Sequence, residues 1–249
     1  MKIFRSLFVA IALALALAPV MALAAEPAVV SAPALQAGDT WVFDRAREQG
    51  TAGFAQRRVD LTIERLGTDT MQVGIKNDGA PTGFEDHMLG LDWSQRRLIG
   101  SQQEVTGRPF AFPMKVGSTW TTDFVDNRQI GLRTSAHFHV TYKVVGWEDV
   151  TVPAGTFHAL KIEANGIVDA TVKASTTAVA GGAVTSSGGT AISQVKKTPA
   201  GIVHSITYGV QYYVPEIKYY VKSIQEEYNS ENVRTVRDTD SLVSFKAAH

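Results

Sequence analysis

Apolar and polar residues alternate with a period of two along most of the chain after residue 38. In the segment 58–66, aliphatic residues alternate with charged or hydroxyl residues, and the segments 71–77 and 137–144 repeat this pattern. A period of two places the apolar side chains of a β-strand on one face and its polar side chains on the other. After the N-terminal leader, no stretch of about 12 residues has the period of an amphipathic helix. The pattern therefore predicts an all-β protein.

Two further features describe how the strands begin and bend. The sequence G-x-T-W-x-x-D occurs at 38–44 and again at 117–123, and each copy has a glycine suited to a turn before a strand. We expect Trp41 and Trp120 to pack inward from these strands. The stretch 201–228 is rich in isoleucine, valine and tyrosine, which favour strands, and its proline at 215 predicts one bend.

The first 24 residues have the form of a signal peptide. Lys2 and Arg5 precede an uncharged apolar run over 7–18, and Ala22-Leu23-Ala24 has the small-x-small form that a signal peptidase accepts. The alternative is a retained membrane anchor, because residues 7–25 carry no charge. We expect cleavage near Ala24, export to the periplasm or full secretion, and no transmembrane segment in the mature chain.

The rest of the chain is expected to form one domain. Residues 25–37 are rich in alanine, proline and valine and predict an extended lead-in, followed by a single β domain over 38–249. Within it, a segment at about 171–193 consists almost wholly of small residues, which cannot fill a core. Such a composition predicts a flexible loop or a loosely paired hairpin that projects from the sheet.

Composition excludes several classes of function. The chain carries 24 basic and 24 acidic residues, and this balance predicts no nucleic-acid partner. It has no cysteine, which excludes disulfides, thiolate metal sites, cysteine nucleophiles and a lipid-modified N-terminal cysteine. Hydrophobic residues make up 45% of the chain, which is enough for a globular protein.

Candidate chemistry is sparse. The sequence has no G-x-S-x-G elbow, no phosphate-binding P-loop, no H-E-x-x-H and no G-x-G-x-x-G, so we predict no cofactor and favour a protein that is not an enzyme. His137 and His139 would share one face of a strand and are weak candidates for metal ligands, because two imidazoles alone are an incomplete site. Glu85, Asp86 and His87 could form an acid–base or cation site, but adjacent strand residues point to opposite faces.

A second candidate site is a binding surface on the stretch 201–228. His204 shares its strand face with aliphatic residues and with Tyr208 and Tyr212, so an imidazole and phenol groups would lie on an apolar face. The alternative is a core histidine bonded to a backbone carbonyl. A concave apolar face with a few polar groups is typical of a cavity for an amphiphile, so these three residues are the predicted ligand-binding residues.

Three segments resemble a group of exported bacterial proteins. Residues 149–163 contain V-P-A-G-T-F-H-A-L-K-I-E and are similar to a hairpin of exported, mostly uncharacterised bacterial β-sheet proteins of the domain-of-unknown-function type. Residues 212–222 resemble a later strand pair of that group, with its Y-x-P and V-K elements, and residues 112–120 resemble its strand entrance before a tryptophan. The resemblance implies a single strongly curved antiparallel sheet, an open half-barrel or barrel-like fold comparable with periplasmic lipoprotein carriers. It implies no catalytic residue.

Three functional hypotheses follow. The first is a non-catalytic periplasmic binding or carrier module for an apolar or amphiphilic ligand, such as a lipid, or for a hydrophobic segment of a partner. The second is a structural or assembly protein of the envelope that contacts a protein partner through its sheet edges or its small-residue segment. The third is a hydrolase or metal-dependent enzyme with a dispersed site formed by the histidines and carboxylates of 85–87 and 137–139.

Overall fold

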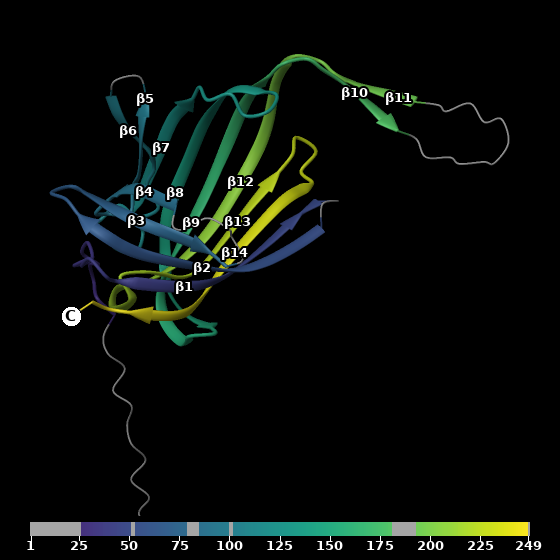
Figure 1. The fold of residues 1–249 in the computed structure, drawn as a ribbon. Coiled ribbons are helices and arrows are strands. Elements are labelled where there is room, and N and C mark those ends of the chain that lie inside the picture. The colour runs from purple at the N-terminus through teal and green to yellow at the C-terminus, as the bar shows by residue number, and fades with distance from the viewer. Residues whose placement is uncertain (1–25, 51–52, 79–84, 100–101, 181–192, 249) are drawn as a thin grey trace, which may run out of the picture.

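The computed structural model describes residues 26–50, 53–78, 85–99, 102–180 and 193–248 (Figure 1). The predicted signal peptide, residues 1–24, lies outside the described residues. Almost all regular structure in the described part is β-strand, as the alternating pattern predicts.

Twelve strands form one antiparallel sheet in the order β6-β5-β4-β3-β2-β1-β14-β13-β12-β9-β8-β7. A separate two-stranded sheet consists of β10 and β11. In chain order the strands are β1 (Thr40–Gln49), β2 (Gly53–Leu66), β3 (Thr70–Asn77), β4 (Glu85–Gly90), β5 (Gln95–Ile99), β6 (Gln102–Gly107), β7 (Thr119–Asp126), β8 (Arg133–Val152), β9 (Gly155–Val172), β10 (Ser175–Ala180), β11 (Ser193–Thr198), β12 (Gly201–Val214), β13 (Tyr219–Tyr228) and β14 (Arg234–Lys246). A three-residue 3-10 turn, η2 (Pro215–Ile217), reverses the chain between β12 and β13.

The large sheet curves strongly, so that its two edge strands, β6 and β7, approach each other (Figure 1). Pairing of β1 with β14 joins the N-terminal and C-terminal halves of the sheet. β9 pairs directly with β12, so the large sheet continues past the intervening segment that contains β10 and β11. The predicted fold class, a single strongly curved antiparallel sheet that is barrel-like, is confirmed.

Aromatic side chains fill one end of the concave face. Trp41 on β1 packs edge-on against Trp93 at 5.2 Å between ring centroids, and Trp93 stacks on Tyr219 at 3.8 Å. Trp41 is fully buried, whereas Trp120 is half-buried and stacks on Tyr142. The glycine that opens each G-x-T-W copy has a positive φ, +95° and +86°, which is the turn conformation that glycine adopts freely.

A buried carboxylate ties three distant segments together at this end. Asp39, which is fully buried, accepts hydrogen bonds from the backbone N–H groups of Gln36 and Ala248, both at 2.9 Å, and from Lys218 Nζ at 2.8 Å. The indole N–H of Trp41 donates to the carbonyl of Ile217 at 2.8 Å. The lead-in, the C-terminus and the β12–β13 corner are therefore held at one point.

The lead-in and the small-residue segment each contribute some regular structure. In the lead-in, Val30 pairs with Met114 in an isolated β-bridge. The segment predicted at about 171–193 begins within β9, and residues 175–180 and 193–198 then pair as the β10–β11 hairpin. This hairpin projects away from the large sheet (Figure 1). The part of the segment between its two strands, 181–192, lies outside the described residues.

We predict that Asp39→Asn strongly destabilises the protein. Asparagine has one acceptor oxygen where the carboxylate has two, so at least one of the donors from Gln36, Lys218 or Ala248 would face an amide NH₂ group. The ammonium of Lys218, which is largely buried, would also lose its counter-charge. Breaking a buried pair by removing one partner costs about 3–5 kcal/mol. Urea unfolding gives the free energy of unfolding directly.

Asp44→Asn is the matched control, because Asp44 lies on the adjoining strand β1 and pairs with Arg58 at 3.3 Å near the surface. Exposed pairs of this kind contribute about 0–1 kcal/mol. Equal losses of stability in the two variants would contradict the role assigned to Asp39.

Candidate functional site

A large cleft runs along the concave face of the twelve-stranded sheet. Its volume is about 1060 Å³, and every strand of the large sheet contributes residues to its lining. The aromatic cluster around Trp93 and Tyr219 borders its closed end. The concave face is therefore packed at one end and hollow above it.

One wall of the cleft is apolar. Strands β7, β8 and β9 lie side by side at one end of the strand order, and their residues that face the cleft alternate with outward-facing ones. The rings of Phe124 and Phe138 stack at 4.7 Å between centroids, nearly parallel at 6°. The apolar residues of this wall are Phe124, Phe138, Val140, Tyr142, Ile162, Ala164, Val168 and Ala170.

The wall formed by β1, β13 and β14 is polar. Arg45 donates two hydrogen bonds of 2.7 Å to the two carboxylate oxygens of Asp240, and Tyr220 donates its hydroxyl hydrogen to the same carboxylate at 2.8 Å. Asp240 is only 7% exposed, and burial raises the pKa of Tyr220. Ser223, also buried, lines the cleft beside this pair. The cleft is thus amphipathic, with charged and apolar walls in one hollow.

A cluster of arginines surrounds Asp126 at the end of β7, beyond the apolar wall. Arg128 contacts the Asp126 carboxylate at 2.8 Å, Arg97 at 3.2 Å and Arg133 at 3.5 Å. The hydrogen bonds from Arg128 hold the pKa of Asp126 well below its usual range, and the charge of Arg97 lowers it further. All four residues line the cleft.

Several buried polar atoms along the cleft have no hydrogen-bond partner among the described residues. They are Arg96 Nε, Thr106 Oγ1, Arg133 Nε, Gln211 Oε1 and Asp238 Oδ1. Buried polar groups in folded proteins are nearly always satisfied by protein, by water or by a ligand. The residues that carry these atoms line the cleft, but the atoms themselves are buried and would bond a molecule in the cleft only after a side-chain movement.

The three residues predicted to bind a ligand do not lie together in this cleft. The side chain of His204 is 65% exposed and bonds Asp169 at 2.7 Å, and Tyr212 donates its hydroxyl to Glu148 at 3.4 Å. Neither lines the cleft, whereas Tyr208 borders it.

The reason is the register of β12 against β9. The partners of the cleft-lining residues Ala164 and Ile162 are Gly209 and Gln211, so the odd-numbered positions of β12 face the cleft. His204 and its even-numbered neighbours alternate to the other face. That face also carries exposed isoleucines that do not line the cleft, Ile167 on β9 and Ile202 on β12, so an apolar alternation does not distinguish the inside from the outside.

His137 and His139 also lie on the outer face, and β7 supplies them with a shared partner. His137 Nε2 lies 2.8 Å from Asp123 Oδ1, and His139 Nδ1 lies 2.7 Å from Asp123 Oδ2. Hydrogen bonds from His139 and from His137 lower the pKa of Asp123. Within the described part of the chain, no group of three or more histidines and carboxylates is arranged to hold a metal ion.

The residues proposed for a hydrolase or metal enzyme are not assembled at one place. Glu85, Asp86 and His87 lie on β4, which pairs with β3, and of these His87 borders the cleft. The side chains of Glu85 and Asp86 lie outside the described parts of the structure. His137 and His139 point to the opposite side of the sheet from the cleft-lining Phe138 and Val140.

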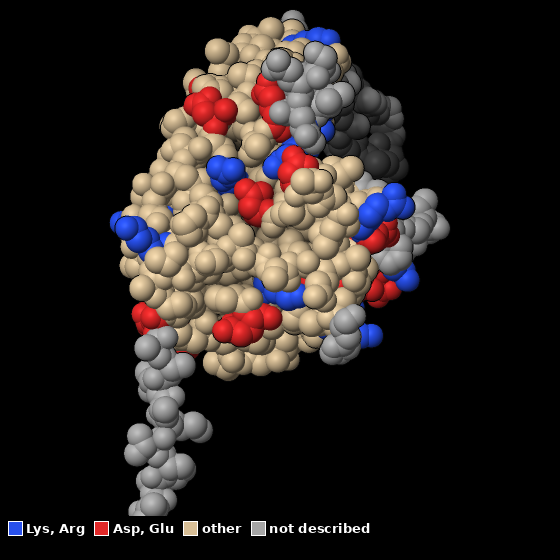
Figure 2. All heavy atoms as spheres, turned by 90° about the vertical axis from the view of Figure 1, so that its left-hand side faces the viewer, with Lys and Arg blue, Asp and Glu red and all other residues tan. Residues whose placement is uncertain are grey.

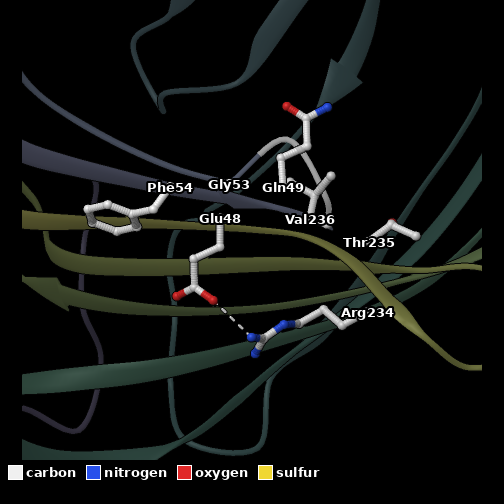
Figure 3. A pocket seen from close by; sticks show the side chains of 8 residues that line it. Glu48, Gln49, Gly53, Phe54, Arg234, Thr235 and Val236 are labelled. Atoms are coloured by element: carbon white, nitrogen blue, oxygen red, sulfur yellow. Dashed lines mark hydrogen bonds and ion pairs between the residues drawn. The ribbon is translucent and has the colours of Figure 1, made fainter. Parts of the chain in front are cut away.

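A smaller hollow of about 350 Å³ lies where the end of β1 and the start of β2 meet the start of β14 (Figure 3). Its charged groups pair with each other, since Arg234 donates to Glu48 at 2.9 Å, and Phe54 at its edge is largely exposed. On the face shown in Figure 2, acidic and basic side chains are interspersed among uncharged surface. Neither feature rivals the large cleft as a site.

We predict an elevated pKa for His158, which lies outside the cleft. Its ring stacks on Trp147 at 5.5 Å, and hydrogen bonds to Asp149 at 2.6 Å and to Glu26 at 3.2 Å raise the pKa above its ordinary value of 6.5. Because the folded-state pKa is raised, the ion pair stabilises the fold at low pH and is lost as pH rises through that pKa. An NMR titration of the imidazole should show the raised pKa and a fall in Asp149→Asn. An unchanged pKa in this variant would contradict the pairing.

Comparison with known proteins gives likenesses of fold only. No family model matches the chain, and no curated protein matches it. One similar solved structure, from Bacteroides fragilis, is described as a candidate exported protein with a YmcC-like fold; it is 16% identical, with 88% of this chain and 99% of that chain covered and a TM-score of 0.42. Another, a candidate lipoprotein from Parabacteroides distasonis, is 14% identical, with 89% and 100% covered and a TM-score of 0.43. At these identities no residue role is transferred.

Proposed function

We propose that this protein is a non-catalytic binding or carrier module that holds an apolar or amphiphilic ligand in the cleft of its curved sheet. The observation that carries the proposal is the hollow concave face, with its apolar wall on β7, β8 and β9 and its polar wall on β1, β13 and β14. A sheet that served only as a scaffold would gain stability by filling this space with side chains.

The size and lining of the cleft suit a small molecule. Its volume of about 1060 Å³ is slightly larger than the usual range for ligand pockets, which is roughly 300–1,000 Å³. Such pockets combine a mostly apolar lining with a few placed polar groups. Here Phe124, Phe138 and Val140 supply apolar surface, and the polar side chains on β1, β13 and β14 supply hydrogen-bonding groups.

The proposed location is the periplasm, or the medium after secretion. It rests on the signal-peptide pattern of residues 1–24 and on the expected cleavage near Ala24. Among the described residues, the structure contains no helix with the length and apolar character needed to cross a membrane.

An envelope assembly role is the second candidate, and one observation favours it. The β10–β11 hairpin forms its own small sheet and extends away from the large one (Figure 1). A projecting hairpin of this kind could contact a partner protein by strand addition. Co-purification of a stoichiometric partner that is lost when 175–198 is deleted would favour this role over the carrier.

We predict that Ala164→Trp blocks ligand binding. Ala164 lines the cleft on β9 opposite Gly209, so an indole there would occupy the apolar part of the hollow. The probe is N-phenyl-1-naphthylamine, an uncharged dye whose fluorescence rises in apolar surroundings. We expect wild-type protein to bind it and Ala164→Trp to bind at least about tenfold more weakly, which corresponds to about 1.4 kcal/mol.

Asn165→Trp is the matched control, because Asn165 is the next residue on β9 and is exposed on the outer face. This variant should bind the dye as the wild type does. If wild-type protein fails to bind the dye, or if both variants lose binding equally, the cleft is not the site and the proposed function is wrong.

A further inference from the structure

The positive charges of the cleft are not evenly balanced. Where β1 and β2 meet β13 and β14, three arginines face three carboxylates, which are Arg45, Arg47 and Arg57 against Glu227, Asp238 and Asp240. Arg96 pairs with Asp69 at 2.9 Å. At the end of β7, by contrast, Arg97, Arg128 and Arg133 share the single carboxylate of Asp126.

The excess at Asp126 amounts to two positive charges. Among the described residues, no other carboxylate lies within 4.0 Å of Arg97, Arg128 or Arg133. Glu104 is the partner of Arg97 in the β5–β6 register, but the two form no ion pair. An arginine cluster that exceeds its carboxylates attracts an anion, and of the three arginines Arg133 is the least exposed to water, at 24%.

The geometry leaves donors free for that anion. Arg128 donates several hydrogen bonds of 2.8–3.1 Å to the Asp126 carboxylate, and the Asp126 side chain is only 6% exposed. Arg97 and Arg133 contact the same carboxylate at longer distances, 3.2 and 3.5 Å. A guanidinium has five N–H donors, and Arg97 and Arg133 each contact Asp126 through only one nitrogen. Their remaining donors can bind a second anion while Arg128 holds Asp126.

Apolar surface begins directly next to this cluster. Phe124 lies two residues before Asp126 on the same face of β7, a spacing of about 7 Å, and stacks on Phe138 of β8. On β9 the same face continues from Val168 to Ile162, roughly 20 Å of strand without a charged side chain. A ligand whose charged end reaches the arginines would lay its remaining length along this wall.

We propose that the cleft takes a single-chain amphiphile with an anionic head group, carboxylate or phosphate, bound by Arg97 and Arg133 with its apolar tail along β7, β8 and β9. This inference rests on the proposed function and specifies its ligand. Guanidinium groups bind carboxylate and phosphate oxygens with matched, often bidentate geometry. A cationic head group would instead meet three guanidinium groups.

The experiment measures displacement of N-phenyl-1-naphthylamine by four amphiphiles with the same sixteen-carbon (C16) chain, below their aggregation concentrations. Palmitate carries a carboxylate and palmitoyl lysophosphatidic acid a phosphate, while monopalmitoylglycerol is uncharged and cetyltrimethylammonium is cationic. We expect at least one of the anionic ligands to bind about tenfold or more tightly than the uncharged ligand, and the cationic ligand to bind most weakly. The two anionic arms distinguish a carboxylate source from a phosphate source.

The variant Arg97→Gln/Arg133→Gln should abolish the preference for the anion, so that the anionic and the uncharged ligands bind with similar affinity. It retains Arg128, which neutralises Asp126. Arg58→Gln/Arg65→Gln removes the same net charge outside the cleft and should keep the preference.

Equal affinities for anionic, uncharged and cationic ligands would overturn the inference, and so would an unchanged preference in Arg97→Gln/Arg133→Gln. Either result leaves the proposed function standing, because the uncharged dye would still bind in the cleft. Failure of the dye itself to bind wild-type protein removes the proposed function instead.

Discussion

The shape of the molecule depends on how one end of the curved sheet is closed. Asp39, which is fully buried, binds the lead-in at Gln36, the C-terminal segment at Ala248 and the β12–β13 corner at Lys218. Trp41, two residues along, reaches the same corner through its indole N–H. Three regions far apart in sequence meet at one carboxylate, which holds the pairing of β1 with β14 at the end where Thr40 lies opposite Lys246. Above this closed end the strands can diverge without a filled core.

The walls of the resulting cleft differ in polarity. Side chains on β7, β8 and β9 leave apolar surface facing the cleft, while β1, β13 and β14 carry the buried pair of Arg45 and Asp240. Burying such a pair costs desolvation that its mutual attraction only partly offsets. A cleft with charged groups beside apolar surface is suited to a ligand with both kinds of surface. The excess of arginines around Asp126 favours a ligand with a negative charge.

The alternation of side chains was sufficient to predict the all-β class and the burial of Trp41, because each is a local property of a strand. The cleft could not be predicted in the same way. On β12 both faces carry apolar residues, and only the register against β9 shows that Gln211 faces inward and His204 outward. The arginine cluster was missed for a related reason: Arg97 lies on β5, near the opposite end of the strand order from β7, and meets Asp126 only because the sheet curves. The pairing that brings Asp123 to His139 is likewise a matter of register.

The central claim is that ligand enters the concave side of the sheet and not its outer face. NMR measures this through intermolecular nuclear Overhauser effects between bound N-phenyl-1-naphthylamine and methyl groups of the protein. The account predicts contacts from the dye to the methyl groups of Val140, Ile162 and Val168, which line the cleft. Contacts confined to Ile167 on β9 and Ile202 on β12, which are exposed and do not line the cleft, would contradict it.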